Sequence, residues 1–285
     1  MATHNQHHYL PAAYFKSWCG ADGRLKYFTY KDGKPIAGLA HRKHITKALN
    51  LYSVFGAPDA KIQQIEKDFF SPLIDTPGAK IHEKLLLKNN EPLSKEERHL
   101  WVKYILALRA RTPEAVEKIR VLSKEMIEQV LLDSQEEYES IRPLGAPGTL
   151  RECIESWFIE NIGVLRVLPS VIEIETTRNA LLDMHWVCFD VTKSGGEFIT
   201  SDRPLTWHKS PQDEDFFLAL PLSPSLGFVI AKSAITLEKL SSLNRLELVS
   251  RFNESTISNS KNYVYSACGY EDNLIFNKIS KSPTK

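Results

Sequence analysis

The middle of the chain carries apolar residues at the spacing of an amphipathic helix. Residues 59 to about 138 therefore predict a helical segment. Pro72 and the Thr76-Pro77-Gly78 group are expected to interrupt or kink it, because proline and glycine break regular helices. Its first buried stripe is predicted by residues at intervals of three and four, namely Ile62, Ile65, Phe69 and Leu73.

Helix starts are marked by capping residues at three places. Ser94 with Glu97 and Thr149 with Glu152 have the spacing of capping boxes. Thr112-Pro113-Glu114 offers a cap, a proline suited to the first turn and an acid that suits the helix dipole. We expect residues 141–148, rich in proline and glycine, to form a loop. The helix that follows Thr112 is predicted to bury one face, formed by Ile119, Leu122, Met126 and Val130.

The period of the pattern changes to that of strands near both ends of the chain. Residues 25–30 predict a strand, and Asp32-Gly33 predicts the turn of a hairpin. After about residue 182, aromatic and branched residues predict further strands. The later elements are expected to be a hairpin of 185–191 with 197–200, a hairpin of 216–220 with 226–231, a helix over 237–252 and a strand over 263–266.

This order of elements predicts an α+β fold. A helical central region, about 59–180, is expected to pack against a mostly antiparallel sheet formed by the N-terminal and C-terminal parts. The strand-rich region covers about 182–270. No boundary in the pattern demands two domains, so we predict a single domain over 1–285.

Composition narrows the class of protein. With 42% hydrophobic and 25% charged residues, the chain has the balance of a globular protein and not of a disordered one. No apolar run reaches the length of a membrane helix, and the first residues lack a secretory signal, so we expect a cytoplasmic protein without membrane contact. The four cysteines lie far apart in the sequence, which disfavours a cysteine zinc site.

Familiar nucleotide, zinc-protease and hydrolase motifs are absent, so candidate chemistry rests on isolated polar residues. His8 precedes Tyr14 and Lys16, whose surroundings are rich in aromatic residues. A docked His8 could transfer a proton or bind a metal. The alternative is a frayed terminus with a solvated histidine.

Arg111 directly precedes the predicted helix cap at Thr112. A guanidinium beside a helix N-terminus suits a phosphate or carboxylate. The alternative is an arginine that pins the corner between two helices to an acidic side chain.

Two carboxylates have contexts that suit a site. Asp202, with Ser201 beside it, ends a predicted strand before Pro204, where it could serve as a base or metal ligand. An Asx-type turn is the alternative for Asp202. Glu66 lies at the margin of the helical stripe, where burial would raise its pKa. The alternative is that Glu66 lies on a solvated flank of the helix. Asn253 is a weaker candidate.

The blocks that carry these residues resemble the domain-of-unknown-function family 4238. The resemblance covers nearly the whole chain, and it departs at Arg203, where the family often has Asn. It implies a prokaryotic protein without an assigned activity, with a suspected role in conflict systems such as phage defence. The matching blocks are His8-Tyr9-Leu10-Pro11 with Tyr14-Phe15-Lys16, Leu51-Tyr52-Ser53, Glu66, Arg111-Thr112-Pro113, Thr200-Ser201-Asp202-Arg203-Pro204, Pro221-Leu222-Ser223-Pro224 and Asn253 with Tyr265-Ser266.

Two hypotheses follow. The first is a hydrolase of phosphate esters, such as a nuclease, with His8, Glu66 and Asp202 as catalytic groups. Asp202 and Glu66 would hold a divalent metal such as Mg or Mn. The substrate would be bound by Arg111, Ser201, Tyr14, Lys16 and Asn253.

The second hypothesis is a non-catalytic binding or sensor module whose polar motifs are structural. The formal net charge of +1 does not imply a nucleic-acid partner by itself. Basic residues from Arg42 to Lys47 form a candidate patch, although such a cluster is also common on a solvated surface.

Overall fold

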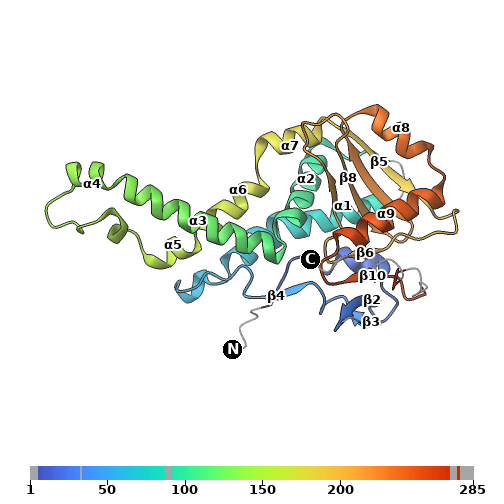
Figure 1. Cartoon of the computed structure of the whole chain (residues 1–285), viewed down its shortest axis with the longest axis horizontal. Coiled ribbons are helices and arrows are strands. Elements are labelled where there is room, and N and C mark those ends of the chain that lie inside the picture. The colour runs from blue at the N-terminus through green and yellow to red at the C-terminus, as the bar shows by residue number, and fades with distance from the viewer. Residues whose placement is uncertain (1–5, 33, 88–90, 270–274, 277–285) are drawn as a thin grey trace.

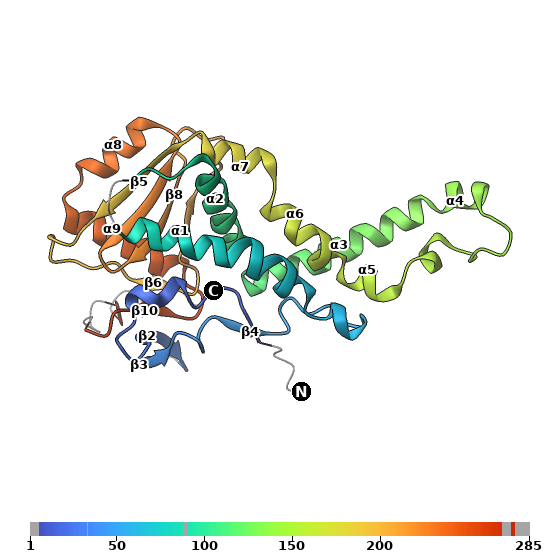
Figure 2. The ribbon, with the colours of Figure 1, turned by 180° about the vertical axis from the view of Figure 1, so that it is seen from behind.

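The computed structural model describes residues 6–32, 34–87, 91–269 and 275–276, and it confirms the α+β fold. A body of strands and helices carries a long helical arm on one side (Figures 1 and 2). No helix in the described ranges is long and apolar enough to cross a membrane.

One antiparallel sheet forms the centre of the body. Its strand order is β5-β9-β8-β7, with β5 at His185–Asp190, β9 at Leu226–Ala231, β8 at Phe217–Ser223 and β7 at Thr206–His208. Both faces of β8 and β9 are buried, because Leu220 and Phe228 join the core on one side and Ala219 and Val229 join a second cluster on the other. The predicted hairpin over 216–231 is confirmed.

A second antiparallel sheet joins the two ends of the chain, as predicted. Its order is β3-β2-β10-β6, with β3 at Lys34–His41, β2 at Arg24–Lys31, β10 at Val264–Ser266 and β6 at Thr200–Ser201. The predicted pairing of 185–191 with 197–200 is wrong, because β5 pairs with β9 and Thr200 pairs with Tyr265. Gly33 lies outside the described residues. A two-stranded ladder joins β1 (Gln6–His8) to β4 (Lys47–Leu49).

Helices and helical turns supply the rest of the fold. Those around the sheets and before the arm are the 3-10 turns η1 (Tyr14–Trp18) and η2 (Asp59–Lys61), the π-helix η3 (Ile65–Asp75), α1 (Thr76–Leu86) and α2 (Lys95–Ala110). The arm and its return consist of α3 (Pro113–Asp133), α4 (Gln135–Ile141), η4 (Leu150–Cys153), α5 (Ser156–Ile162), η5 (Gly163–Val167), α6 (Leu168–Ile172) and α7 (Glu175–Leu182).

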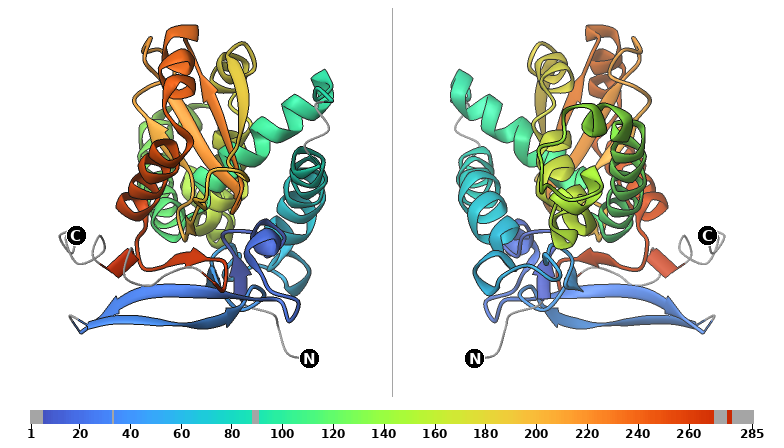
Figure 3. Two further views of the ribbon diagram at one scale, coloured as in Figure 1. Left: turned by 90° about the vertical axis from the view of Figure 1, so that its right-hand side faces the viewer. Right: turned by 90° about the vertical axis from the view of Figure 1, so that its left-hand side faces the viewer.

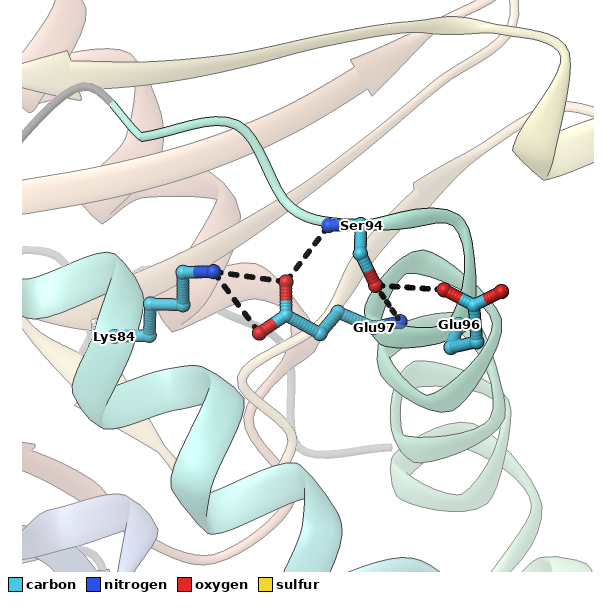
Figure 4. Close-up of polar contacts among 4 residues, drawn as sticks. All are labelled: Lys84, Ser94, Glu96 and Glu97. Carbon is cyan, nitrogen blue, oxygen red and sulfur yellow. Dashed lines mark hydrogen bonds and ion pairs between the residues drawn. The ribbon is translucent and has the colours of Figure 1, made fainter.

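The capping boxes were predicted correctly. Ser94 Oγ accepts a hydrogen bond of 3.2 Å from the Glu97 amide, and the Ser94 amide donates to Glu97 Oε2 at 2.7 Å (Figure 4). Lys84 holds the same carboxylate at 2.9 Å and thereby ties α1 to α2. Thr112 caps α3 as expected, while the Thr149 box opens only the 3-10 turn η4.

The predicted stripe of the first helical segment is only partly right, because this segment is a π-helix: Ile65 is buried and Phe69 packs against the core. Its buried residues are Ile65, Phe70 and Ile74, at intervals of five and four, while Leu73 is 51% exposed. A π-helix bonds residue i to i+5, which lengthens its period beyond that of an α-helix. Pro72 lies inside η3, and the chain passes into α1 without a break.

Gly78 has a different role from the predicted interruption. A Cβ at this position would lie 2.1 Å from Tyr104 Cδ2 on α2. The glycine therefore allows α1 and α2 to pack closely, and Pro77 sits in the first turn of α1.

Two other helix predictions need correction. The helix predicted over 237–252 is two helices, α8 (Ala234–Ser242) and α9 (Arg245–Asn259), because Asn244 caps α9 by accepting from the Glu247 amide at 2.9 Å. On α3, the predicted buried face is only partly buried: Ile119 packs against the core, but Leu122 is 51%, Met126 70% and Val130 50% exposed. The arm projects from the body, so the rest of this face has no layer to pack against (Figure 1).

Candidate functional site

Three of the predicted site residues come together beside the corner between α2 and α3. Arg111 ends α2, and its side chain is fully buried. His8 lies on β1 and Glu66 on η3, and the charge of Arg111 lowers the pKa of both. We call His8, Glu66, Asp75 and Arg111 the polar cluster.

The Arg111 guanidinium is charged and only partly used by the protein. Its Nη1 lies 2.7 Å from Asp75 Oδ1 in an ion pair, whereas Nε and Nη2 have no hydrogen-bond partner within the described ranges. Burial has the largest single effect and lowers the pKa of Arg111, but the Asp75 carboxylate, Tyr52 and Tyr104 together outweigh it, so the net pKa is raised. The Phe70 ring centroid lies 5.2 Å from its central carbon. Buried N–H donors without partners are costly, which makes this group a candidate ligand site.

The π-helix explains how the two carboxylates reach the same arginine. Glu66 and Asp75 are nine residues apart in η3. Nine residues place side chains on opposite sides of an α-helix, at 3.6 residues per turn. With the i to i+5 bonds of a π-helix, at roughly 4.4 residues per turn, the same interval makes about two full turns. Both carboxylates therefore lie on one side, and the Asp75 charge contributes to the perturbed titration of Glu66.

Glu66 titrates near neutral pH. Burial raises its pKa from 4.5 to about 7; the Asp75 charge adds to this rise, while Arg111 opposes it. Its Oε2 is buried and has no hydrogen-bond partner in the described part of the chain. A carboxyl group with this pKa can donate or accept a proton at physiological pH.

His8 is a neutral imidazole at the same place. Burial lowers its pKa to about 4, and the charge of Lys47 adds to this, followed by smaller effects of Arg111 and His44. A backbone hydrogen bond with Lys43 opposes the shift. Nε2 of His8 is buried and has no partner among the described residues. His8 is therefore docked, and the alternative of a frayed terminus does not apply to it.

His7, next along the same strand, is fully engaged in the structure. Its Nδ1 accepts the Tyr52 amide at 2.9 Å, its Nε2 meets Gln63 Oε1, and its ring stacks on Tyr52 at 5.3 Å. Because Nδ1 accepts, the ring proton lies on Nε2 and points to Gln63. His7 thus holds Tyr52, whose hydroxyl donates to the Arg111 carbonyl at 3.3 Å.

Asp202 belongs to a separate network. Its carboxylate accepts three backbone N–H groups, from Lys261 at 2.9 Å, Asn262 at 2.7 Å and Tyr263 at 3.2 Å. Burial raises the pKa of Asp202 and these three bonds oppose the rise. The carboxylate therefore holds the segment that leads into β10 beside β6. It does not form the local Asx turn that the sequence offered as an alternative.

The predicted metal pair of Asp202 and Glu66 is therefore not brought together. The charges that act on Glu66 are Asp75 and Arg111, while Asp202 is bound by backbone and lies near Arg203. Within the described residues, no group of three His, Cys, Asp or Glu side chains has the arrangement of a metal site.

The remaining predicted ligands make contacts elsewhere. Tyr14 is fully buried, and its hydroxyl donates to the Pro221 carbonyl at 2.7 Å. Lys16 is exposed and pairs with Glu83 at 3.0 Å. Ser201 accepts the Arg203 amide at 3.1 Å, and Asn253 bonds the backbone of the segment before β6. None of these contacts involves the polar cluster.

Sequence reasoning missed Asp75 and Tyr52 as parts of the site. Asp75 carried no signal because its approach to Arg111 depends on π-helical winding. Arg203, the departure from the family pattern, pairs with Glu114 of α3 at 2.6 Å.

A sequence model of the family described as "Protein of unknown function (DUF4238)" matches residues 6–268. No curated protein and no solved structure matches the chain. The matched range contains every residue of the polar cluster as well as Asp202.

Proposed function

Because the chain belongs to the DUF4238 family, whose description assigns no function, we propose one from the polar cluster: a hydrolase that acts on phosphate esters. Arg111 binds the phosphate, and Glu66 and His8 transfer protons. The single observation that carries this proposal is the fully buried, charged Arg111 guanidinium whose Nε and Nη2 have no partner among the described residues. Planar N–H donors of this kind match the oxygens of a phosphate.

The protonation states of the cluster suit the reaction. With a pKa of about 7, Glu66 carries its proton in a large fraction of molecules at neutral pH. A bound phosphate would raise that pKa further, because a second negative charge disfavours the carboxylate. His8, neutral with a pKa of about 4, would become a stronger base beside the same anion.

The chemical step balances with these two groups. Water attacks phosphorus, and the ester P–O bond breaks with its electron pair left on the departing oxygen. Glu66 donates its proton to that oxygen, while His8 accepts a proton from the attacking water. Exchange with solvent then returns both groups to their starting states. Arg111 stabilises the negative charge that develops on the phosphoryl oxygens.

A non-catalytic anion-binding module is the second candidate. The Arg111–Asp75 ion pair favours it, because this is the corner clamp considered as an alternative from sequence. The bonds of Asp202 to backbone have the same structural character. In this reading the cluster binds a phosphate without turning it over.

We further propose that the protein acts in the cytoplasm. All four cysteines are free thiols, and three of them are exposed. Exposed free thiols suit a reducing compartment.

Phosphate binding and turnover test the proposal together. We would titrate inorganic phosphate by calorimetry and measure hydrolysis of 4-nitrophenyl phosphate and bis(4-nitrophenyl) phosphate. Arg111→Lys should abolish phosphate binding, because it removes the planar fork. Glu66→Gln should keep binding and lose about 100-fold or more in rate, as expected for loss of a general acid.

Arg120→Lys is the matched control for the arginine change. Arg120 also lies half buried at the start of the arm, but its guanidinium donates to the carbonyls of Leu51 and Ser53 and to Asn161. We expect this variant to keep phosphate binding. Wild-type binding without turnover would support the module, and equal binding by folded Arg111→Lys would refute both candidates.

A further inference from the structure

The charge of this chain is concentrated in one segment. Residues 24–47 contain seven Lys or Arg and one Asp, a net charge of +6. Since the whole chain has a formal charge of +1, the remaining residues carry −5. This segment is the β2–β3 hairpin with the turn that leads to β4; we call it the basic hairpin. Such a local concentration attracts polyanions even when the net charge is near zero.

The basic hairpin is open to solvent. It extends along the base of the molecule and reaches beyond the helices above it (Figure 3). Lys31, Lys34 and Lys43 are exposed, and none of them has an ion pair within the described ranges. Arg24 has an acidic neighbour, Asp22, only at 3.8 Å. The charges of these three lysines are therefore not paired with an acidic side chain in the described part of the chain.

The basic hairpin ends at the polar cluster. Lys47 pairs with His8 across β4 and β1, and Lys43 bonds His8 through its backbone. The turn is held there in a strained form, since Thr46 has a φ of +51°, a conformation that β-branched residues rarely adopt. Its carbonyl accepts the Tyr9 amide at 3.0 Å, and its hydroxyl donates to the Leu10 carbonyl at 3.1 Å. Strain of this kind is frequent at functional sites.

Tyrosine rings lie on or beside the basic hairpin. Tyr27 of β2 meets Tyr263 at 6.1 Å in an edge arrangement, and Tyr263 is 40% exposed. Tyr30, further along β2, is 36% exposed. Exposed aromatic rings near basic side chains are common in proteins that bind single-stranded nucleic acid, since unpaired bases stack on the rings.

We propose that the basic hairpin binds single-stranded nucleic acid and leads one of its phosphates to Arg111. This inference rests on the proposed function, because it names the substrate class of the same site. Lysines along β2 and β3 contact successive phosphates, and the turn at Lys43–Lys47 brings the backbone past His8. A duplex would offer the same phosphates without unstacked bases, so the rings favour the single strand.

Fluorescence anisotropy with a fluorescein-labelled 20-nucleotide strand of mixed sequence tests the proposal, with the matching duplex as a second probe. We expect wild type to bind the strand more tightly than the duplex at low salt. Lys31→Gln/Lys34→Gln/Lys43→Gln should lose at least about tenfold in affinity, and the slope of log K against log salt should shrink by about 2, since each phosphate contact on a single strand contributes roughly 0.7.

The control removes three exposed lysines outside the hairpin, in Lys95→Gln/Lys193→Gln/Lys239→Gln. It should bind the strand as wild type does, and both triple variants should keep calorimetric binding of inorganic phosphate. Phosphate binding without strand binding by wild type would overturn this inference and leave the proposed function standing. Strand binding without phosphate binding would instead refute the function. Equal losses in both triple variants, tighter binding of the duplex, or equally tight binding to phosphatidylserine vesicles would also overturn the inference.

Discussion

Neighbouring side chains with the same chemistry have different roles in this protein. His7 and His8 are adjacent, yet His7 has both ring nitrogens bonded while His8 keeps a buried nitrogen without a described partner. The sequence identified His8, Glu66 and Arg111 from their local contexts, and the structure brings these three together. The sequence could not exclude Asp202 from the site, because the backbone groups that bond this carboxylate come from residues some sixty positions later.

At the residue scale, Glu66→Gln should change the pH dependence of stability. Glutamate ionises near 4.5 in the unfolded chain and near 7 in the folded one. Below pH 4.5 both states hold the proton, so the substitution should have little effect. Between pH 4.5 and 7 the unfolded chain loses this proton while the folded chain keeps it, so wild type loses stability relative to the variant. The difference should reach about 3 kcal/mol and stay constant above pH 7.

Urea unfolding of both proteins from pH 4.5 to 8.5 measures this difference. Glu83→Gln is the control, because Glu83 is exposed and pairs with Lys16 on the surface. A difference between Glu66→Gln and wild type that stays constant over this pH range would show that Glu66 titrates normally.

At the scale of elements, the sequence predicted where helices start better than how their interiors pack. Capping depends on residues three positions apart, so Ser94 with Glu97 and Asn244 with Glu247 are local features, although only the first was recognised. The winding of η3 is not local in this sense, because it depends on which residues the neighbouring helices bury. The same holds for Gly78, whose missing Cβ makes room for Tyr104.

The arm should depend on one close helix contact. A Cβ on Gly163 would lie 2.9 Å from the Ile119 carbonyl oxygen and 3.0 Å from the Arg120 Cα, both backbone atoms of α3. Backbone cannot rotate away as a side chain does, so Gly163→Ala should lower the free energy of unfolding by about 2 kcal/mol or more.

Thermal and denaturant unfolding test this contact. Gly148→Ala provides the control, because its Cβ would meet only ordinary contacts at 3.7 and 3.9 Å. If Gly163→Ala proved as stable as this control, the close packing of η5 on α3 would be disproved.

At the scale of the whole molecule, the two ends of the chain are joined in one sheet. β10 from the C-terminal part lies between β2 and β6, and Asp202 holds the segment that leads into β10. The α+β class and the joining of the two ends followed from the order of helical and strand patterns. The order of strands did not follow from these patterns, because β5 pairs with β9 (Leu226–Ala231) and not with residues 197–200.

Asp202→Ala should therefore destabilise the molecule without emptying the polar cluster. Three backbone N–H groups would lose their acceptor, at a cost of about 3 kcal/mol in the free energy of unfolding. Phosphate affinity, measured at a temperature where the variant is folded, should equal that of wild type. A variant that stays stable but no longer binds phosphate would show that Asp202 belongs to the site.

The most direct measurement of the central claim is a crystal structure of the protein soaked in tungstate, a heavy analogue of phosphate. We predict an anomalous peak within hydrogen-bond distance of Arg111 Nε and Nη2, with Glu66 and His8 beside it, and no such peak in Arg111→Lys. Tungstate bound elsewhere or not at all in wild type, with no anion beside Arg111 Nε and Nη2, would contradict the account.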